Sequence, residues 1–424
     1  MKFEAQHSRV TVNAKQLQRL RPQIRNVSQA TMQSDFASVC APFDVQKLRE
    51  CRLLAKQYIG VELVVLIGIG GSNLGTIAVR DALLGQNAQL AGSPQFLFAD
   101  TTDSDVLFGI KQQMTQTIAR KKKVLLISIS KSGSTTETIA NTRVFVSHLK
   151  TLQKGFEKYV VVISDKNSQY ESFAKEQGFA TLSISKKIGG RFSVFSAVGL
   201  FALELSRIST TQLLKGARQA VLDNTTSSLS TNIAAKNALI MEKLYKKGFV
   251  NANLFVFNSD FESIGKWFRQ LIGESIGKEF STSGRKIHCG IQPTVSVGST
   301  DLHSLAQLYV GGPNTTYHMF LHAPSKKSVA VSEPAWNHLV SHLQNKKIQT
   351  IHSAILQGIT KTLQTKKRPL SVYELHKKSE YEIGYFLQTK MIEVMYLGYL
   401  LDVNPFDQPN VEDYKNVTRK ILQS

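Results

Sequence analysis

A run of short hydroxyl side chains, SKSGSTTET at residues 130–138, has the residue types in this sequence that most clearly suggest chemistry. Six of its nine residues carry a hydroxyl, and the run follows an apolar segment and opens a helical pattern. Backbone amides at a helix start attract anions, and serine and threonine hydroxyls add neutral donors. Ser134 and Glu137 also fit a capping box. The run therefore predicts either a phosphate-binding loop or a hydroxyl-rich helix cap.

A second loop, GIGGSNLG at residues 68–75, also lies between an apolar run and a helical pattern. Asn73 stands where G-x-G-x-x-G needs its third glycine, and the loop lacks the lysine of a P-loop. Asp100, at the end of the next apolar run, resembles a ribose-binding acid but lies farther along the chain than is usual. Loops at the carboxyl ends of parallel strands converge on one crevice, so we expect both loops to hold one small phosphorylated ligand.

The elements that must position these loops are apolar runs separated by helical patterns. The runs lack strict alternation, which is typical of strands buried on both faces, and they cover 61–70, 93–100, 123–130 and 159–165. Helical patterns occupy 73–85 and 135–150. Strand, helix and strand at this spacing predict a parallel α/β sheet.

The same alternation begins again after residue 210. An amphipathic helix is predicted within 261–277, and further strands are predicted at 253–260, 319–324 and 369–375. We therefore predict an α/β fold of two flavodoxin-like parallel-sheet domains with helices on both faces. The expected boundaries are a helical N-terminal segment 1–42, a first domain 43–208, a second domain 209–375 and a C-terminal helical arm 376–424.

The composition predicts a cytoplasmic protein without a membrane or nucleic-acid partner. The formal net charge is +21, but the lysines form short scattered clusters without a recognisable nucleic-acid motif. We interpret this charge as a solvated surface that attracts small anions, with a polyanion site as the alternative. The three cysteines form neither a zinc pattern nor a disulfide framework, and no apolar run approaches the length that spans a bilayer. The first residues show no signal peptide.

Six motifs along the chain together resemble the phosphoglucose isomerase family, whose sugar isomerase (SIS) domains share the SKSG type of loop. They are GIGGSNLG, SKSGSTTET, GGRFSVFSAVGL (189–200), GESIGK (273–278), STDLHSLAQ (299–307) and FDQPNVEDYK (406–415). The resemblance implies two SIS domains in the compact bacterial form of the family. It also implies a homodimer with active sites shared between subunits, and interconversion of glucose 6-phosphate and fructose 6-phosphate in glycolysis and gluconeogenesis. It implies neither a metal nor an organic cofactor.

The resemblance also implies a role for each matching residue. Glu274 would be the base that moves a proton between sugar carbons through a cis-enediol(ate), and Arg191 would stabilise that intermediate. His303, donated by the neighbouring subunit, and Lys415 would assist ring opening. The residues expected to contact the substrate or its phosphate are Gly71, Ser72, Ser130, Lys131, Ser132, Thr135, Gln270 and Gln408.

Taken singly, the proposed catalytic residues also have ordinary structural interpretations. Glu274 and Lys415 would be surface residues, and Arg191 would form a salt bridge at a helix start. His303 would border the apolar stripe of a helix that contains Leu302, Leu305, Ala306 and Tyr309. The motifs favour the catalytic interpretation for all four residues.

One position departs from the family pattern. Asn410 stands where the family usually has glycine or alanine. Asparagine tolerates unusual backbone angles, but its side chain could crowd Gln408 or displace Lys415.

Three alternatives remain open at the level of sequence. The first is a non-enzymatic sugar-phosphate-binding SIS regulator, although 1–60 holds no candidate helix-turn-helix. The second is a nicotinamide oxidoreductase, suggested by GIGG and Asp100. The third is an isomerase that accepts both glucose 6-phosphate and mannose 6-phosphate.

Overall fold

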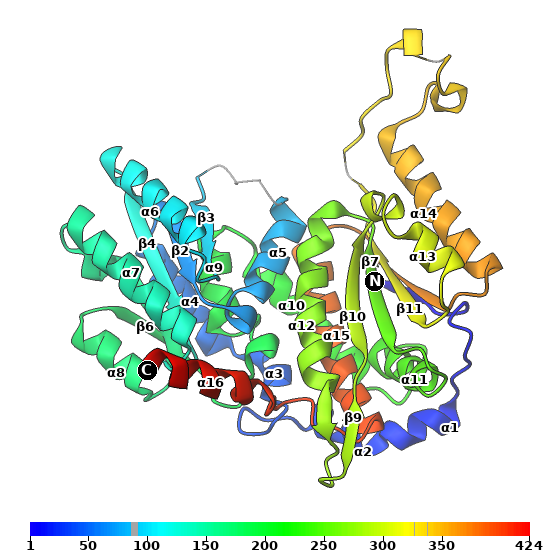
Figure 1. Cartoon of the computed structure of the whole chain (residues 1–424), viewed down its shortest axis with the longest axis horizontal. Helices are drawn as coiled ribbons and strands as arrows, with labels where there is room; N and C mark the ends of the chain where they lie inside the picture. Colours follow the sequence, from blue (N-terminus) through cyan, green and yellow to red (C-terminus); the bar gives the residue numbers. More distant parts are fainter. Residues whose placement is uncertain (86–91, 326, 337) are drawn as a thin grey trace.

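Two β-sheets with helices between and around them form the architecture (Figure 1). The structure is a computed structural model that describes residues 1–85, 92–325, 327–336 and 338–424. The first sheet has five parallel strands in the order β3-β2-β4-β5-β6. These are β2 (Val61–Ile67), β3 (Gln95–Ala99), β4 (Lys123–Ile129), β5 (Val160–Asp165) and β6 (Ala180–Ile184).

Helices cover both faces of the first sheet, which explains why its strands are apolar without alternation. One buried apolar cluster joins the sheet to α6 (Ser104–Ala119), α7 (Thr136–Leu152) and α8 (Gln169–Glu176). The main cluster joins the other face to α4 (Val45–Lys56), α5 (Leu74–Leu84) and α9 (Ala197–Leu205).

The second sheet has the order β1-β12-β11-β7-β10. Four strands are parallel: β7 (Asn251–Val256), β10 (Gln292–Val297), β11 (Thr316–His322) and β12 (Leu370–Glu374). The fifth strand, β1 (Lys2–Glu4), pairs antiparallel with β12. The predicted N-terminal helical segment 1–42 is therefore wrong at its start, because residues 2–4 complete the edge of this sheet. The rest of that segment holds α1 (Ala14–Leu17), α2 (Arg21–Ser28) and α3 (Ala37–Cys40).

The two sheets share one strand order. Among the parallel strands of each sheet, the first along the chain lies between the second and the third, which is the flavodoxin-like arrangement. The predicted α/β class with two parallel sheets flanked by helices is confirmed.

The predicted C-terminal arm divides into a core helix and an exposed one. Helix α15 (Glu380–Leu400) is almost entirely buried and packs against α10 (Thr210–Asn224), α11 (Ile233–Tyr245) and α12 (Glu262–Ile276). Only α16 (Val411–Gln423) lacks buried residues, and in the view of Figure 1 it extends below the first sheet. The segment 376–424 is helical as expected, but α15 belongs to the core rather than to an arm, because its apolar side chains are buried.

The main apolar core is continuous from the first sheet to the second through α5, α9, α10, α12 and α15. The proposed boundaries at 43–208 and 209–375 therefore remain a prediction. On the outer face of the second sheet lie α13 (Ala306–Gly311) and α14 (Ile348–Thr365), and a hairpin of β8 (Lys278–Phe280) and β9 (Lys286–Cys289) follows α12. Across the described ranges, no helix combines the length and the apolar character needed to cross a membrane.

Candidate active site

The two hydroxyl-containing loops lie side by side at the carboxyl ends of the adjacent parallel strands β2 and β4. Gly68 allows this approach. A Cβ atom at Gly68 would lie 2.7 Å from the Cβ of Ser72 and 3.3 Å from the carbonyl oxygen of Ile129. Any larger residue would push the loops apart, so glycine at this position brings the hydroxyls of both loops to one edge of the sheet.

The loop after β4 is organised by hydrogen bonds among its own hydroxyls. Ser130 is 1% exposed; its Oγ donates to Oγ1 of Thr135 at 3.3 Å and accepts from the amide of Gly133 at 3.1 Å. Ser132 is exposed, and its Oγ lies 2.6 Å from Oγ of Ser134. Gly133 has φ +73°, and a Cβ there would lie 2.5 Å from the Cβ of Tyr170. The turn therefore requires glycine and presents a cluster of neutral donors.

The capping box predicted from Ser134 and Glu137 is wrong. The N-cap of α7 is Thr135, and the side chain of Thr135 forms no capping hydrogen bond. The hydroxyls of Ser132 and Ser134 bond to each other instead. The first amides of α7 therefore lack a side-chain cap, which is the arrangement that accommodates an anion.

The loop after β2 connects the first sheet to two distant segments. A Cβ at Gly71 would lie 2.1 Å from the carbonyl carbon of Gly190, and Oγ of Ser193 donates to the carbonyl oxygen of Gly71 at 3.1 Å. Gly70 has φ +60°, and a Cβ there would lie 2.8 Å from Nε2 of Gln270 on α12. Three segments that are far apart in the sequence therefore meet beside the hydroxyl loops.

Arg191 lies at the centre of this meeting point. Its side chain is 2% exposed, and its Nη1 donates to Oε2 of Glu274 at 3.2 Å and to Oε1 of Gln408 at 2.8 Å. Burial lowers the pKa of Arg191, and the carboxylate of Glu274 opposes that shift. Its remaining acceptors are Oγ of Ser275 at 2.7 Å and the carbonyl oxygens of Pro405 at 2.6 Å and Asp407 at 3.0 Å.

Glu274 and Gln270 lie one turn apart on α12 and share a face. Nε2 of Gln270 donates to Oε1 of Glu274 at 3.0 Å, so two donors orient the carboxylate. The Glu274 side chain remains 30% exposed and can be reached by a ligand. Oε1 of Gln270 is buried and has no hydrogen-bond partner among the described residues. A hydroxyl group of a bound ligand is the type of donor that would satisfy it.

Lys131 adds a cation beside the hydroxyl loop. It is half-buried, and its Nζ donates to the carbonyl oxygen of Lys186 at 2.5 Å. Burial lowers the pKa of Lys131, whereas the charge of Asp165 opposes the change. The position permits an ammonium group to face an anion held by the loop.

Lys278 is a site residue to which the sequence motifs gave no role. Its side chain is 4% exposed, its Nζ donates to the carbonyl oxygen of Glu274 at 2.9 Å, and it pairs with Oδ1 of Asp407 at 2.9 Å. Burial lowers the pKa of Lys278, and the contact with Asp407 opposes that shift. Lys278 therefore joins the end of α12 to the C-terminal segment that carries three acceptors of Arg191. The GESIGK motif contains it, but only the fold reveals its partners.

Two predicted catalytic residues are not brought to this cluster within the described chain. His303 is exposed; it follows a short 3₁₀ turn, Thr300–Leu302, and precedes α13, which begins at Ala306. The continuous helix expected through this stretch is therefore wrong, although Leu302, Leu305 and Tyr309 do face the core. Lys415 lies on exposed α16 and pairs with Glu412 at 2.8 Å.

Asn410 does not adopt unusual backbone angles. Its φ is −67° and its ψ is −18°, and its Nδ2 donates to Oε2 of Glu279 at 3.0 Å. The side chain turns toward Glu279, while Gln408 bonds to Arg191. The expected crowding of Gln408 is therefore wrong.

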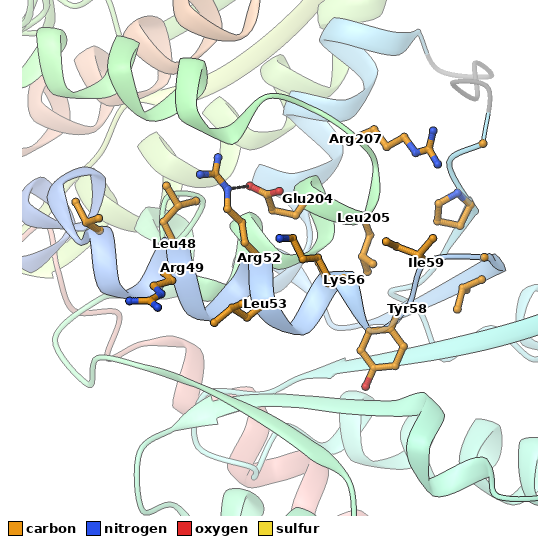
Figure 2. Close-up of a pocket in the computed structure, with 16 residues that line it drawn as sticks. Leu48, Arg49, Arg52, Leu53, Lys56, Tyr58, Ile59, Glu204, Leu205 and Arg207 are labelled. Atoms are coloured by element: carbon orange, nitrogen blue, oxygen red, sulfur yellow. Dashed lines mark hydrogen bonds and ion pairs between the residues drawn. The ribbon is translucent and has the colours of Figure 1, made fainter.

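A cavity of about 660 Å³ lies at the amino ends of β2 and β3, opposite to the hydroxyl loops (Figure 2). Arg52 and Glu204 form an ion pair of 2.8 Å in its wall, and exposed Leu53 and Ile59 contribute to its lining. This cavity contains none of the predicted site residues. Asp100, the candidate ribose ligand, accepts from Nδ2 of Asn73 at 2.8 Å. In the part of the chain that the structure describes, no group of His, Cys, Asp and Glu residues is arranged to hold a metal ion.

Comparison with known proteins gives a consistent result. The family model for phosphoglucose isomerase matches residues 44–424. A glucose-6-phosphate isomerase from Mycoplasma capricolum subsp. capricolum is 33% identical over 372 residues, which cover 85% of this chain and 83% of that protein. A hypothetical protein from Thermus thermophilus has a TM-score of 0.88 at 27% identity over the whole of both chains. A glucose-6-phosphate isomerase from Chlamydia trachomatis has a TM-score of 0.84 at 18% identity, covering 99% of this chain and 88% of that one, which shows the fold.

Proposed function

Because this chain belongs to the phosphoglucose isomerase family, we propose that it interconverts glucose 6-phosphate and fructose 6-phosphate with Glu274 as the base. The observation that carries the proposal is the cluster of Arg191, Glu274, Gln270 and Gln408 beside the two loops that follow β2 and β4. An isomerase of this type needs a phosphate-binding site (the anion grip) and a general base (the proton carrier), separated by no more than the length of one sugar. The loops supply candidates for the anion grip, and Glu274 in the cluster is the candidate for the proton carrier.

The phosphate would be held mainly by neutral donors. Ser72, Ser130, Ser132 and Thr135 supply hydroxyls, and the first amides of α7 point to the same edge of the sheet. Lys131 supplies one positive charge. A grip of this kind fixes the far end of the substrate and leaves the reacting carbons to the Glu274 side of the crevice.

The proton transfer would run through an enediolate. The carboxylate of Glu274 removes the proton from C2 of the open-chain aldose, and the C1 carbonyl oxygen takes up negative charge. The fixed guanidinium of Arg191 stabilises that oxygen and keeps its own proton throughout. The proton of the C2 hydroxyl then passes to the C1 oxygen. Glu274 returns its own proton to C1 while the C2 oxygen becomes the carbonyl, which gives the ketose.

Ring opening would use residues outside the cluster. We propose that His303 of the partner subunit and Lys415 move protons between the ring oxygen and the C1 hydroxyl. The exposure of His303 at the surface of the described chain supports a role toward a second subunit. The same proposal makes the active protein a homodimer.

The test is a coupled assay of fructose 6-phosphate conversion in EDTA, comparing the original protein with Glu274→Gln. Glutamine keeps the size of the side chain but cannot accept the proton, so turnover should fall by about three decades or more while phosphate-ligand affinity stays within about threefold. Near-normal turnover in Glu274→Gln would remove Glu274 as the base. Conversion that is lost in EDTA would contradict a mechanism without a metal.

A further inference from the structure

A buried polar row crosses the second sheet where parallel strands are usually apolar. Thr294 of β10, Asn253 of β7 and His318 of β11 are direct neighbours in the strand register. Asn253 and His318 are 0% and 1% exposed. Oδ1 of Asn253 accepts from the hydroxyls of Thr294 at 3.1 Å and Ser296 at 3.3 Å. No residue of this row belongs to the cluster around Arg191.

Thr294 and His318 of this row line a cavity of about 520 Å³ at the amino ends of these strands, and Asn253 lies between them in the sheet. Leu308 and Tyr309 of α13 cover it from the outer face, and Arg269 and Arg368 bring two guanidinium groups to its wall. None of the described residues that line it is an aspartate or glutamate. The cavity therefore collects positive charge without a compensating carboxylate.

The guanidinium group of Arg368 is held in place by two hydrogen bonds, but one of its donors has no acceptor among the described residues. Its side chain is deeply buried, with 9% of the residue exposed. Its Nη2 donates to the carbonyl oxygens of Val310 at 2.8 Å and Gly312 at 2.7 Å. Its Nε is buried and has no hydrogen-bond partner among the described residues. A buried donor without an acceptor is costly, and an oxyanion would satisfy it.

His318 offers a hydrogen-bond donor rather than a charge. Burial and the charge of Arg368 lower the pKa of His318 to about 3, so its ring is neutral near pH 7. The hydroxyls of Thr294 and Ser296 occupy Oδ1 of Asn253, which leaves Nδ2 of Asn253 to face Nδ1 of His318 at 3.4 Å. The ring proton then belongs on Nε2.

We propose that this cavity is a second anion site, which binds the phosphate group of a small molecule. A tetrahedral oxyanion matches the fork of a fixed arginine, and Arg269, which is exposed on α12, would add a second contact from the rim. The cavity is large enough for inorganic phosphate or for a phosphate ester with a compact polar body. The site does not depend on the proposed isomerase activity.

The test measures phosphate binding by calorimetry in a variant that lacks the proposed phosphate site in the loop after β4. Ser130→Ala with Ser132→Ala should eliminate the loop site, and this double variant should still bind about one phosphate per chain. Adding Arg269→Gln should weaken that binding about tenfold, because one charge-assisted hydrogen bond is lost. Arg368→Lys keeps the charge but not the fork and should weaken it further. Arg143→Gln, an exposed change on α7, is the matched control and should leave affinity within about twofold.

Three outcomes would overturn the site. They are no phosphate binding in the double loop variant, unchanged binding in both Arg269→Gln and Arg368→Lys, and an equal loss in the Arg143→Gln control. Competition distinguishes the sources of the anion: glucose 6-phosphate displaces inorganic phosphate from the double variant if the site takes esters, and does not if it takes free phosphate alone. Normal isomerase activity without this second binding event would reject the site and leave the proposed function intact.

Discussion

Arg191 is positioned by backbone carbonyls as much as by side chains. Two of its acceptors, the carbonyl oxygens of Pro405 and Asp407, lie on the segment that follows α15. Lys278 holds that segment to the end of α12 through Asp407 and the carbonyl oxygen of Glu274. The orientation of the guanidinium therefore depends on a buried lysine that does not contact Arg191 itself.

We expect Lys278→Met to lower kcat more than it raises KM. Methionine fills the space but leaves the carbonyl of Glu274 without its donor and releases Asp407, so the carbonyls that orient Arg191 can shift. The free energy of unfolding should fall by about 1–3 kcal/mol, and kcat by about tenfold or more. Steady-state kinetics and urea unfolding measure the two effects.

Lys286→Met provides the matched control on the same hairpin. Lys286 is 61% exposed, and it pairs with Glu279 at 3.1 Å. Its removal should change stability by less than about 1 kcal/mol and leave kcat unaltered. Equal effects in the two variants would show that Lys278 has no special connection to the site.

At the scale of elements, the contact of Gly71 with Gly190 fixes the loop after β2 against the segment that carries Arg191. Gly71→Ala would place a methyl group 2.1 Å from a backbone carbon, which no rotamer can relieve. We expect a loss of about 2 kcal/mol or more in unfolding free energy, or a shift of the loop with loss of most activity. Thermal unfolding and the isomerase assay together detect either result.

Gly109→Ala is the corresponding control within α6. A Cβ at Gly109 meets nothing within 4 Å. Alanine is favoured over glycine in a helix interior, so this variant should gain about 0.5–1 kcal/mol and keep its activity. If Gly71→Ala proved as harmless as this control, the packing of the two segments would not matter for the site.

The sequence predicted the central elements better than the edges. Strands β2, β4 and β7 were recognisable because both their faces are buried, and α12 because of its apolar stripe. Strand β10 was missed because polar Thr294 and Ser296 interrupt its apolar residues: Thr294 lines the polar cavity, and buried Ser296 bonds to Tyr309. Strand β1 was missed because its partner β12 lies at the far end of the chain. Motifs identified Arg191, Glu274, Gln270 and Gln408. They could not reveal the contacts of Lys278. Backbone carbonyls are present at every residue, so contacts with them cannot be inferred from residue types or from their spacing in the sequence.

At the scale of the whole molecule, His318 links stability to pH. Its pKa is about 3 in the folded protein and about 6.5 in the unfolded chain, so the unfolded chain binds more protons between these values. The contribution of His318 to the free energy of unfolding is fully present above about pH 6.5 and is lost as the pH falls toward 3. His318→Gln should therefore reduce the slope of unfolding free energy against pH by about 1 kcal/mol per unit between pH 6 and 4.

Urea unfolding in phosphate-free buffers between pH 4 and 7 measures this slope. His342→Gln, a change at an exposed histidine, should leave the slope as it is in the original protein. An unchanged slope in His318→Gln would mean that His318 can be protonated without unfolding.

The proposed shared active site predicts rescue between inactive subunits. Glu274→Gln and His303→Ala chains, each inactive alone, should regain up to about a quarter of the original activity when mixed and allowed to exchange, because half of the sites in mixed dimers are intact. Residues 327–336 and 338–347 project from the second sheet (Figure 1). Among them, Trp336, Leu339 and Val329 are 66%, 61% and 60% exposed, which supports contact with another subunit. Exchange is verified by native mass spectrometry, and verified exchange without rescue would contradict the shared site.

The central position of α15 has a consequence for synthesis on the ribosome. Until residues 380–400 emerge, the apolar surfaces of α10, α11 and α12 that pack against α15 remain uncovered, and the carbonyls that will orient Arg191 have not yet been made. A chain stalled before that point would therefore be prone to aggregation and inactive, and we expect it to depend on a chaperone until residues 380–407 leave the exit tunnel.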